Sequence, residues 1–253
     1  MSRCLLSDGP YTILVPVDSA FAKLDQAELT NLQTSPGLLD EVLGVHVIKG
    51  ELFSWDFVSG RVIVSDNGHF IRVYKTQQGT YVNDAKVLKW DVEANGAVLI
   101  FIDTLLDAPE GTIYEVLRKP EFGLSLLGDF VDAAGLNRTL HRTAGPYTMF
   151  APSADAFAKL SDVITDRLKR DTQLLKYVLE YHVHPGTLHL QSLDRNGTLT
   201  TLYRNHNIGV SVTDDIRLNG VAMLEEADID CDNGVIHIID HVLLPSSLGS
   251  VIG

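Results

Sequence analysis

An internal repeat constrains the fold of this chain more than any other feature. The segment GPYTILVP at 9–16 recurs as GPYTMFAP at 145–152, 136 positions later. Both copies run on to AFAKL, at 20–24 and 156–160. A period of this length is typical of two tandem domains and not of a solenoid built from short repeats.

The repeat keeps its register over a long stretch. Leu38, Leu39, Val42, Leu43 and His46 match Leu174, Leu175, Val178, Leu179 and His182 at the same offset of 136, and Asn83 matches Asn219. Asn95-Gly96 then matches Asn233-Gly234 at 138. This alignment predicts two additional residues in the second copy, near 225–231.

The two copies differ at their beginnings. Apolar residues with helical spacing precede the Gly-Pro turn of the second copy, from Ile113 to Val131, whereas eight residues precede that turn in the first copy. The Pro- and Gly-containing stretch 107–111 is typical of a short linker. We therefore predict domains at 1–108 and 111–246, the first without its leading helices.

Each copy shows helical patterns followed by strand patterns. In the second copy, 147–150 is predicted to be extended, and Ser153 is placed to cap a helix that carries Phe157, Leu160, Ile164 and Leu168. A second helix is expected from about 174 to His182. Alternation at 208–212 and the apolar run 235–239 indicate strands. The predicted fold class is α+β.

Charge and hydropathy exclude several functions. The formal charge is −13, with 33 acidic and 20 basic residues, which makes nucleic acid and anionic membrane surfaces unsuitable partners. No apolar stretch approaches the about 20 residues that a membrane span needs. The first eight residues do not fit a secretory signal, so the chain is either intracellular or a piece of a longer protein.

Two sequence patterns favour a longer, secreted protein. Asn137-Arg138-Thr139 and Asn196-Gly197-Thr198 are N-glycosylation acceptors. The two cysteines, Cys4 and Cys231, have no metal-ligand spacing, and their pairing stays open.

Three blocks in the second copy resemble the fasciclin (FAS1) family: 147–157 (YTMFAPSADAF), 179–183 (LEYHV) and 233–245 (NGVIHIIDHVLLP). The resemblance covers nearly the whole chain. It implies two α+β modules, each a β-sandwich-like wedge with packed helices. The first copy departs from the pattern at Val45, where the family has Tyr, and at 97–100, where AVLI replaces the VIHI run.

The resemblance also implies a function and a set of residues. It implies an extracellular role in cell adhesion, matrix association or ligand capture, with integrins as partners of some members and a stabilin-like receptor ectodomain as one parent. Integrin-binding regions of the family correspond here to Tyr181-His182 and to Asp228-Ile229, with Asp91-Val92 at the matching place in the first copy. An exposed Asp beside an apolar residue suits capture by a receptor-bound metal ion.

A structural interpretation of the same residues is open. Tyr181 and His182 would then be core residues that fix the end of a helix, and Asp228 a solvated loop carboxylate. No Arg-Gly-Asp sequence occurs.

Metal binding and catalysis are not indicated. Five of the histidines in the second copy invite a metal hypothesis, but their spacing is unlike that of a metal site, so no cofactor or metal is expected: His182, His184, His189, His237 and His241. No nucleophile elbow, phosphate loop, dinucleotide fingerprint or His-Glu-x-x-His motif is present. We expect a binding module and not an enzyme. The alternatives are a ligand-capturing receptor segment and a structural spacer between other domains.

Overall fold

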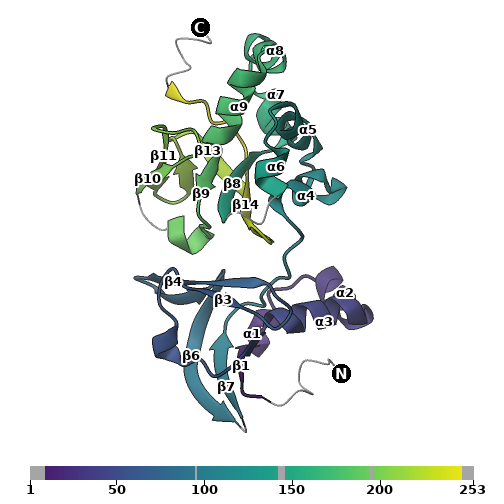
Figure 1. Cartoon of the computed structure of the whole chain (residues 1–253), viewed down its shortest axis with the longest axis vertical. Helices are drawn as coiled ribbons and strands as arrows, with labels where there is room; N and C mark the ends of the chain where they lie inside the picture. Colours follow the sequence, from purple (N-terminus) through teal and green to yellow (C-terminus); the bar gives the residue numbers. More distant parts are fainter. Residues whose placement is uncertain (1–8, 95, 142–145, 194–195, 247–253) are drawn as a thin grey trace. The chain divides into compact units, whose positions relative to one another are not determined.

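The computed structural model describes residues 9–94, 96–141, 146–193 and 196–246. The chain divides into two compact units, Met1–Ala108 and Pro109–Gly253, here called domain 1 and domain 2. Figure 1 shows each as strands with helices packed at one side.

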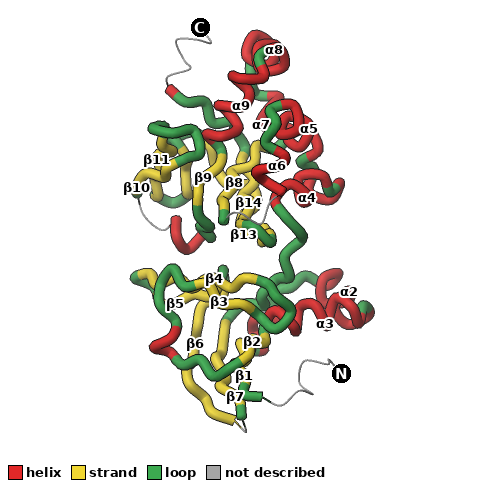
Figure 2. Tube along the Cα trace, in the orientation of Figure 1, coloured by secondary structure: helices red, strands yellow, loops and turns green. Residues whose placement is uncertain are grey.

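The described residues of domain 1 form a seven-stranded sheet with the order β2-β1-β7-β6-β5-β4-β3. Its strands are β1 (Tyr11–Pro16), β2 (Val47–Lys49), β3 (Val62–Val64), β4 (Phe70–Thr76), β5 (Gly79–Val82), β6 (Ala85–Ala94) and β7 (Ala97–Ile102). Its helices are α1 (Asp18–Phe21), α2 (Gln26–Thr34), α3 (Pro36–Val45) and the 3₁₀ turn η2 (Ser54–Asp56). Figure 2 shows that β3 and β4 run across the direction of β6, so that the sheet bends over on itself.

The described residues of domain 2 repeat this sheet in the order β10-β11-β12-β13-β14-β8-β9. Its strands are β8 (Tyr147–Pro152), β9 (Val183–Pro185), β10 (Gly197–Thr200), β11 (Asn207–Val212), β12 (Ile216–Leu218), β13 (Ala222–Cys231) and β14 (Gly234–Ile239). Helices α7 (Ala154–Ala158), α8 (Asp162–Arg170), α9 (Thr172–Tyr181) and η4 (Leu190–Leu193) match those of domain 1. Before β8 it adds α4 (Ile113–Arg118), η3 (Pro120–Phe122), α5 (Ser125–Ala133) and α6 (Asn137–His141).

The mixed sheets confirm the predicted α+β class. In each domain the first strand pairs in parallel with the last, β1 with β7 and β8 with β14. The first strand also pairs antiparallel with the short strand that follows the helices. The helices thus connect two strands that lie side by side, which holds them against one face of the sheet.

Strand register corrects one detail of the repeat. Tyr11 pairs with Ala97 and Tyr147 with Gly234, so the last strands are offset by 137 and not by 138. The β5–β6 connection joins the paired Val82 and Ala85, whereas the β12–β13 connection joins Leu218 and Ala222. The second copy therefore has one additional residue, and it lies in this turn. The expectation of two residues near 225–231 was wrong because it aligned Gly234 with Gly96, whereas the strand register aligns Gly234 with Ala97.

Side-chain caps divide the expected first helix of domain 2 into two. Ser153 Oγ accepts a hydrogen bond from Ala156 N at 3.2 Å and begins α7, as predicted. Ser161 Oγ accepts from Ile164 N at 3.4 Å and begins α8. The Ser161 side chain thus satisfies a backbone N–H in the first turn of a new helix. The single helix that we expected to run through Leu168 is therefore two helices, α7 and α8.

Among the residues that the structure describes, domain 2 has two apolar cores and domain 1 has one. The core inside the bent sheet is present in both: Phe150, Tyr181 and Leu218 belong to it in domain 2, Leu14 and Val82 in domain 1. The second core of domain 2 joins α4 and α5 to α9 and β8 through Ile113, Leu117, Leu127, Leu175, Leu179 and Met149. Among the described residues of domain 1 no helix precedes β1, and this second core has no counterpart.

Candidate functional site

Asp228 and Ile229 lie at a β-bulge in β13, where the pairing with β14 shifts register. Asp228 has a positive φ of 61°, a conformation that Asp and Asn tolerate better than most residues. Its Oδ1 accepts a hydrogen bond of 2.8 Å from Leu190 N at the start of η4. Ile229 is 8% exposed and packs in the core shared with α4 and α5. The carboxylate is thus directed at the backbone of the protein itself.

Asp91 and Val92 form the same bulge in domain 1. Asp91 has a φ of 56°, and the β6–β7 register shifts at this point. Asp91 Oδ1 accepts from Ser54 N at 2.8 Å, and Oδ2 accepts from Ser54 Oγ at 2.7 Å. Both Asp residues therefore fasten the 3₁₀ turn of their domain to the bulge.

Tyr181 and His182 lie at the end of α9 and are buried, at 4% and 0% exposure. The Tyr181 hydroxyl donates to Asn207 O and accepts from Asn219 Nδ2, both at 2.9 Å. His182 Nδ1 donates to Val178 O at 2.7 Å, and Nε2 accepts from Leu243 N at 2.9 Å. Burial lowers the pKa of His182 to about 4, which keeps the ring neutral.

A pair of buried histidines, His189 and His237, lies beside the Asp228 bulge. His237 Nδ1 accepts from Asp228 N at 3.1 Å, and His237 Nε2 donates to Leu188 O at 2.7 Å. His189 Nε2 is 2.8 Å from Asp230 Oδ1. Burial lowers the pKa of His237. Within the described ranges, no group of three or more His, Cys, Asp or Glu side chains is arranged to hold a metal ion.

The two acceptor asparagines have different surroundings. Asn137 is half-buried at the start of α6, and its Oδ1 accepts from Arg138 N at 2.8 Å. Asn196 is exposed before β10, and its Oδ1 accepts from Val212 N at 2.6 Å. Cys231 is a buried free thiol whose pKa burial raises well above its usual value, and Cys4 lies outside the described residues.

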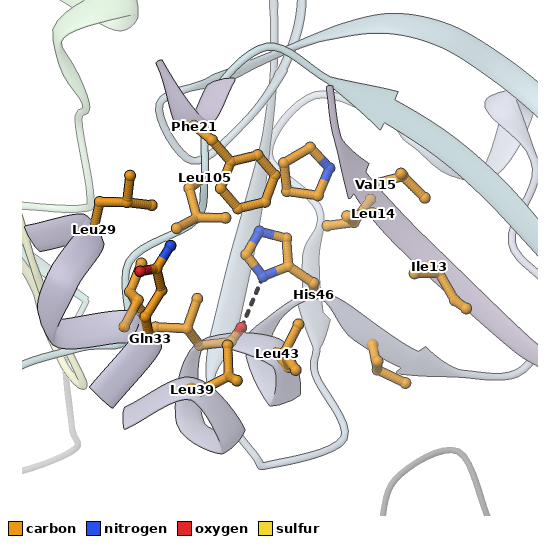
Figure 3. Close-up of a pocket in the computed structure, with 14 residues that line it drawn as sticks. Ile13, Leu14, Val15, Phe21, Leu29, Gln33, Leu39, Leu43, His46 and Leu105 are labelled. Carbon is orange, nitrogen blue, oxygen red and sulfur yellow. Dashed lines mark hydrogen bonds between the residues drawn. The ribbon is translucent and has the colours of Figure 1, made fainter. Parts of the chain in front are cut away.

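A feature that sequence reasoning missed is an apolar groove of about 530 Å³ in domain 1. Figure 3 shows its lining from β1, the α1–α3 helices and the end of the domain, with Ile13, Val15, Phe21, Leu29, Leu39 and Leu43 around it. Phe21, Leu39 and Leu43 are 40%, 40% and 43% exposed. Its polar lining includes Gln33 and His46.

His46 presents no free nitrogen to this groove. Its Nδ1 donates to Val42 O at 2.7 Å, the bond drawn in Figure 3, and its Nε2 accepts from Leu106 N at 3.0 Å. These are the same two bonds that His182 makes in domain 2. Burial lowers the pKa of His46 as well.

The same face is covered in domain 2. Leu175 and Leu179, the counterparts of Leu39 and Leu43, are 2% and 1% exposed and share a core with α4 and α5. The signal that could have found the groove was present in the sequence: apolar spacing in 38–43 without the leading helices that would cover it.

The described geometry defines a class of protein: two tandem α+β modules whose polar side chains at the candidate site hold their own backbone, with an open apolar groove in the first module. A family model described as "Fasciclin domain" matches residues 3–109 and 123–245. The chain belongs to the fasciclin domain family, as its sequence blocks predicted.

Known relatives match nearly the whole chain. Periostin of Homo sapiens is 26% identical over 97% of this chain and 29% of its own length. Stabilin-1 of Mus musculus is 39% identical over 97% of this chain and 10% of its own length. The chain thus spans less than a third of either relative. A solved structure of a FAS1 domain pair from the insect cell adhesion molecule Fasciclin I has a TM-score of 0.48 and 19% identity, over 94% of this chain and 89% of that chain.

None of the helices in the described part of the chain combines the length and apolar character that crossing a membrane requires.

Proposed function

We propose that this chain is an extracellular binding module of the adhesion type, and that domain 1 presents its main contact surface to cell-surface or matrix partners. The groove is the observation that carries this proposal. Leu39 and Leu43 are about 40% exposed beside Phe21, where the other copy of the fold buries the equivalent leucines. Exposed apolar clusters of this kind mark binding surfaces in soluble proteins.

Membership of the fasciclin family and the exposed Asn196 acceptor support the extracellular assignment. The groove also favours ligand capture, the receptor-type alternative, since its volume of about 530 Å³ lies within the usual range of small-molecule sites.

The residues singled out in the sequence have a second role in this proposal. Ile229, Tyr181 and His182 are buried, Asp91 and Asp228 accept hydrogen bonds from backbone, and Val92 is half-buried at the same bulge as Asp91. We propose that these residues act by positioning nearby loops for integrin or matrix contact. Asp228 holds the start of η4, where Leu190 is 38% exposed. Their part in partner binding stays a prediction.

Adhesion of integrin-bearing cells to the purified, glycosylated chain tests the proposal. The variants are Leu43→Glu in the groove and Asp228→Asn at the bulge. Val163→Glu is the matched control, because Val163 is a 69% exposed apolar residue on a helix of domain 2. We expect Leu43→Glu to abolish adhesion and Val163→Glu to leave it unchanged.

Each variant is first checked for native unfolding behaviour. Loss of adhesion with Asp228→Asn alone would move the contact to the bulge and its carboxylate. Absence of adhesion by the unmodified chain to cells and to matrix proteins would overturn the adhesion assignment and favour capture or a spacer role.

A further inference from the structure

The segment that leads into η4 is fastened to the sheet of domain 2 at three points. Leu188 N donates to Thr148 Oγ1 at 2.8 Å, and Leu188 O accepts from His237 Nε2 at 2.7 Å. Leu190 N donates to Asp228 Oδ1 at 2.8 Å. One of these attachments therefore passes through the ring of a buried histidine, and another through the carboxylate beside it.

His237 and Asp228 also meet each other directly. Asp228 N donates to His237 Nδ1 at 3.1 Å, and Asp228 Oδ1 lies 3.8 Å from the same nitrogen. Nδ1 can accept this bond only while it carries no proton, because both nitrogens of a charged imidazole are donors. A proton on Nδ1 would face the Asp228 N–H and would be attracted to Oδ1, the oxygen that holds Leu190 N. Protonation thus opposes the bond at the bulge and competes for the acceptor that fixes η4.

The surroundings of His237 keep its ring neutral in the folded domain. Burial has the largest effect and lowers the pKa of His237; Asp228 and Asp230 on β13 oppose this shift, and His189 ahead of η4 adds to it. From β8, the Phe150 ring stacks on the imidazole with the centroids 5.6 Å apart. The His237 ring is 0% exposed, so a charge on it is poorly solvated while the segment is closed and better solvated once the segment opens.

Domain 1 attaches its own 3₁₀ turn by equivalent backbone bonds. Leu52 N donates to Thr12 Oγ1 at 2.7 Å, as Leu188 N does to Thr148. Ser54 N then donates to Asp91 Oδ1 at 2.8 Å. The two copies of the fold therefore share the frame that holds this turn.

The buried side chains beneath the turn differ between the copies. The strand register places Ile100, which is 0% exposed, at the position of His237. The repeat offset of 136 places Phe53 at the position of His189. Neither Ile nor Phe can take up a proton. The turn can thus be held without histidines, and what the two histidines add in domain 2 is sensitivity to acid.

We propose that His237 and Asp228 form a proton-sensitive latch, which holds η4 on the sheet of domain 2 while His237 is neutral and releases residues 188–193 when the ring is protonated. In the released state Asp228 Oδ1 pairs with the charged ring in place of Leu190 N. In the open segment the ring titrates near its ordinary value, so acid below about pH 6.5 favours release. The latch does not involve the domain 1 groove, and its test is independent of the adhesion test.

Hydrogen exchange of the full chain, followed by mass spectrometry between about pH 7.5 and pH 4.5, tests the latch. Exchange rates are corrected for the intrinsic effect of pH. We expect the opening of 187–193 to increase by up to about tenfold for each pH unit below the ordinary pKa of histidine, until the closed form also titrates. Peptide 51–57, which contains η2, is the internal control and should show no such increase.

Urea separates the latch from unfolding of the whole domain. Urea below the unfolding transition speeds exchange that requires global unfolding, and it leaves exchange through a local opening unchanged. Exchange in 187–193 should therefore be faster than in α9 at every pH and insensitive to low urea. Exchange in 187–193 that follows urea as α9 does would show global unfolding in place of a latch.

Three variants locate the proton. His237→Ile, which copies Ile100 of domain 1, should make the opening of 187–193 independent of pH. His189→Phe copies Phe53 and is the matched control, which should keep the acid response. Asp228→Asn keeps an acceptor for Leu190 N but offers no carboxylate to the charged ring, so its response should shift to lower pH. Unfolding curves verify that each variant folds.

Nuclear magnetic resonance of the ring nitrogens carries the test in the unmodified chain, whether or not His237→Ile folds. His237 should titrate over the pH range in which 187–193 opens. A ring that stays neutral while the segment opens would overturn the proposal. So would an opening of 187–193 that does not respond to pH, or one that 51–57 shares. An acid response that persists in His237→Ile and disappears in His189→Phe would reject His237 as the group that takes up the proton.

Discussion

His182 Nε2 accepts a hydrogen bond of 2.9 Å from the backbone N–H of Leu243, 61 residues further along the chain. The ring can do this only when Nε2 carries no proton. The opposite nitrogen donates to Val178 O, so the described bonds fix one neutral tautomer. His46 holds Leu106 N in the same way in domain 1. In each copy this buried histidine thus ties the end of a helix to the segment that follows the last strand.

This relationship predicts that acid weakens domain 2. The pKa of His182 is about 4 in the folded protein, against an ordinary value of 6.5. Between these values the unfolded chain binds a proton that the folded domain does not. The free energy of unfolding should therefore fall as the pH drops from 6.5 to 4, by about 3 kcal/mol for this residue. The lowered pKa of His237 acts in the same direction.

Urea unfolding at several pH values checks this prediction. The two Trp residues, Trp55 and Trp90, both lie in domain 1, so their fluorescence follows domain 1 while circular dichroism follows both domains. His182→Gln should lower the free energy of unfolding of domain 2 at pH 7. It should also reduce the pH dependence of the domain 2 transition, which circular dichroism detects and Trp fluorescence does not. An unchanged pH dependence in His182→Gln would contradict the assignment.

Asp228→Ala should destabilise domain 2 by about 2 kcal/mol, because it removes a charged acceptor from Leu190 N. Asp228→Asn should cost less, since Asn tolerates the positive φ of 61° and keeps an acceptor oxygen. Asp91→Ala is the companion experiment, and it should shift the Trp-detected transition of domain 1 through the loss of both Ser54 bonds. Equal effects of Ala and Asn at position 228 would show that the hydrogen bond contributes little.

Asn196 should carry more N-linked glycan than Asn137 when the chain is made in a secretory pathway. Asn196 and Thr198 are exposed, whereas Asn137 and Thr139 are half-buried in α6. Mass spectrometry after enzymatic deglycosylation in heavy-oxygen water measures the occupancy of each site. Thr198→Ala and Thr139→Ala identify the two signals. Greater occupancy at Asn137 would contradict the prediction.

Domain 1 should unfold at a lower urea concentration than domain 2. The second apolar core, which joins α4 and α5 to α9 in domain 2, has no counterpart among the described residues of domain 1. Less buried apolar surface means less stabilisation for similar loss of chain entropy. The test is whether the Trp fluorescence transition precedes the later part of the circular dichroism transition. A Trp transition at equal or higher urea would reject this expectation.

The sequence predicted the larger features well and the candidate site poorly. The repeat, the α+β class, the cap at Ser153 and the difference in leading helices follow from local patterns that survive folding. Spacing alone does not show which way a side chain points at a β-bulge, so Asp228 was expected to be exposed, and its carboxylate meets Leu190 N instead. Tyr181 and His182 are buried, and local sequence could not show this because their partners, Asn219 and Leu243, are distant in sequence.

Leu43 and Leu179 offer the sharpest test of the structure, because they occupy the same position in the two copies. Leu179 is 1% exposed under α5, whereas Leu43 is 43% exposed in the groove. Leu179→Ala should cost about 2–5 kcal/mol of domain 2 stability, the usual range for a buried leucine. Leu43→Ala should cost domain 1 less, about 1 kcal/mol, because 43% of Leu43 is already exposed to water. Circular dichroism and Trp fluorescence read the two domains in the same urea series. A large loss with Leu43→Ala would show that the groove is covered in the isolated chain, and it would remove the surface on which the adhesion proposal depends.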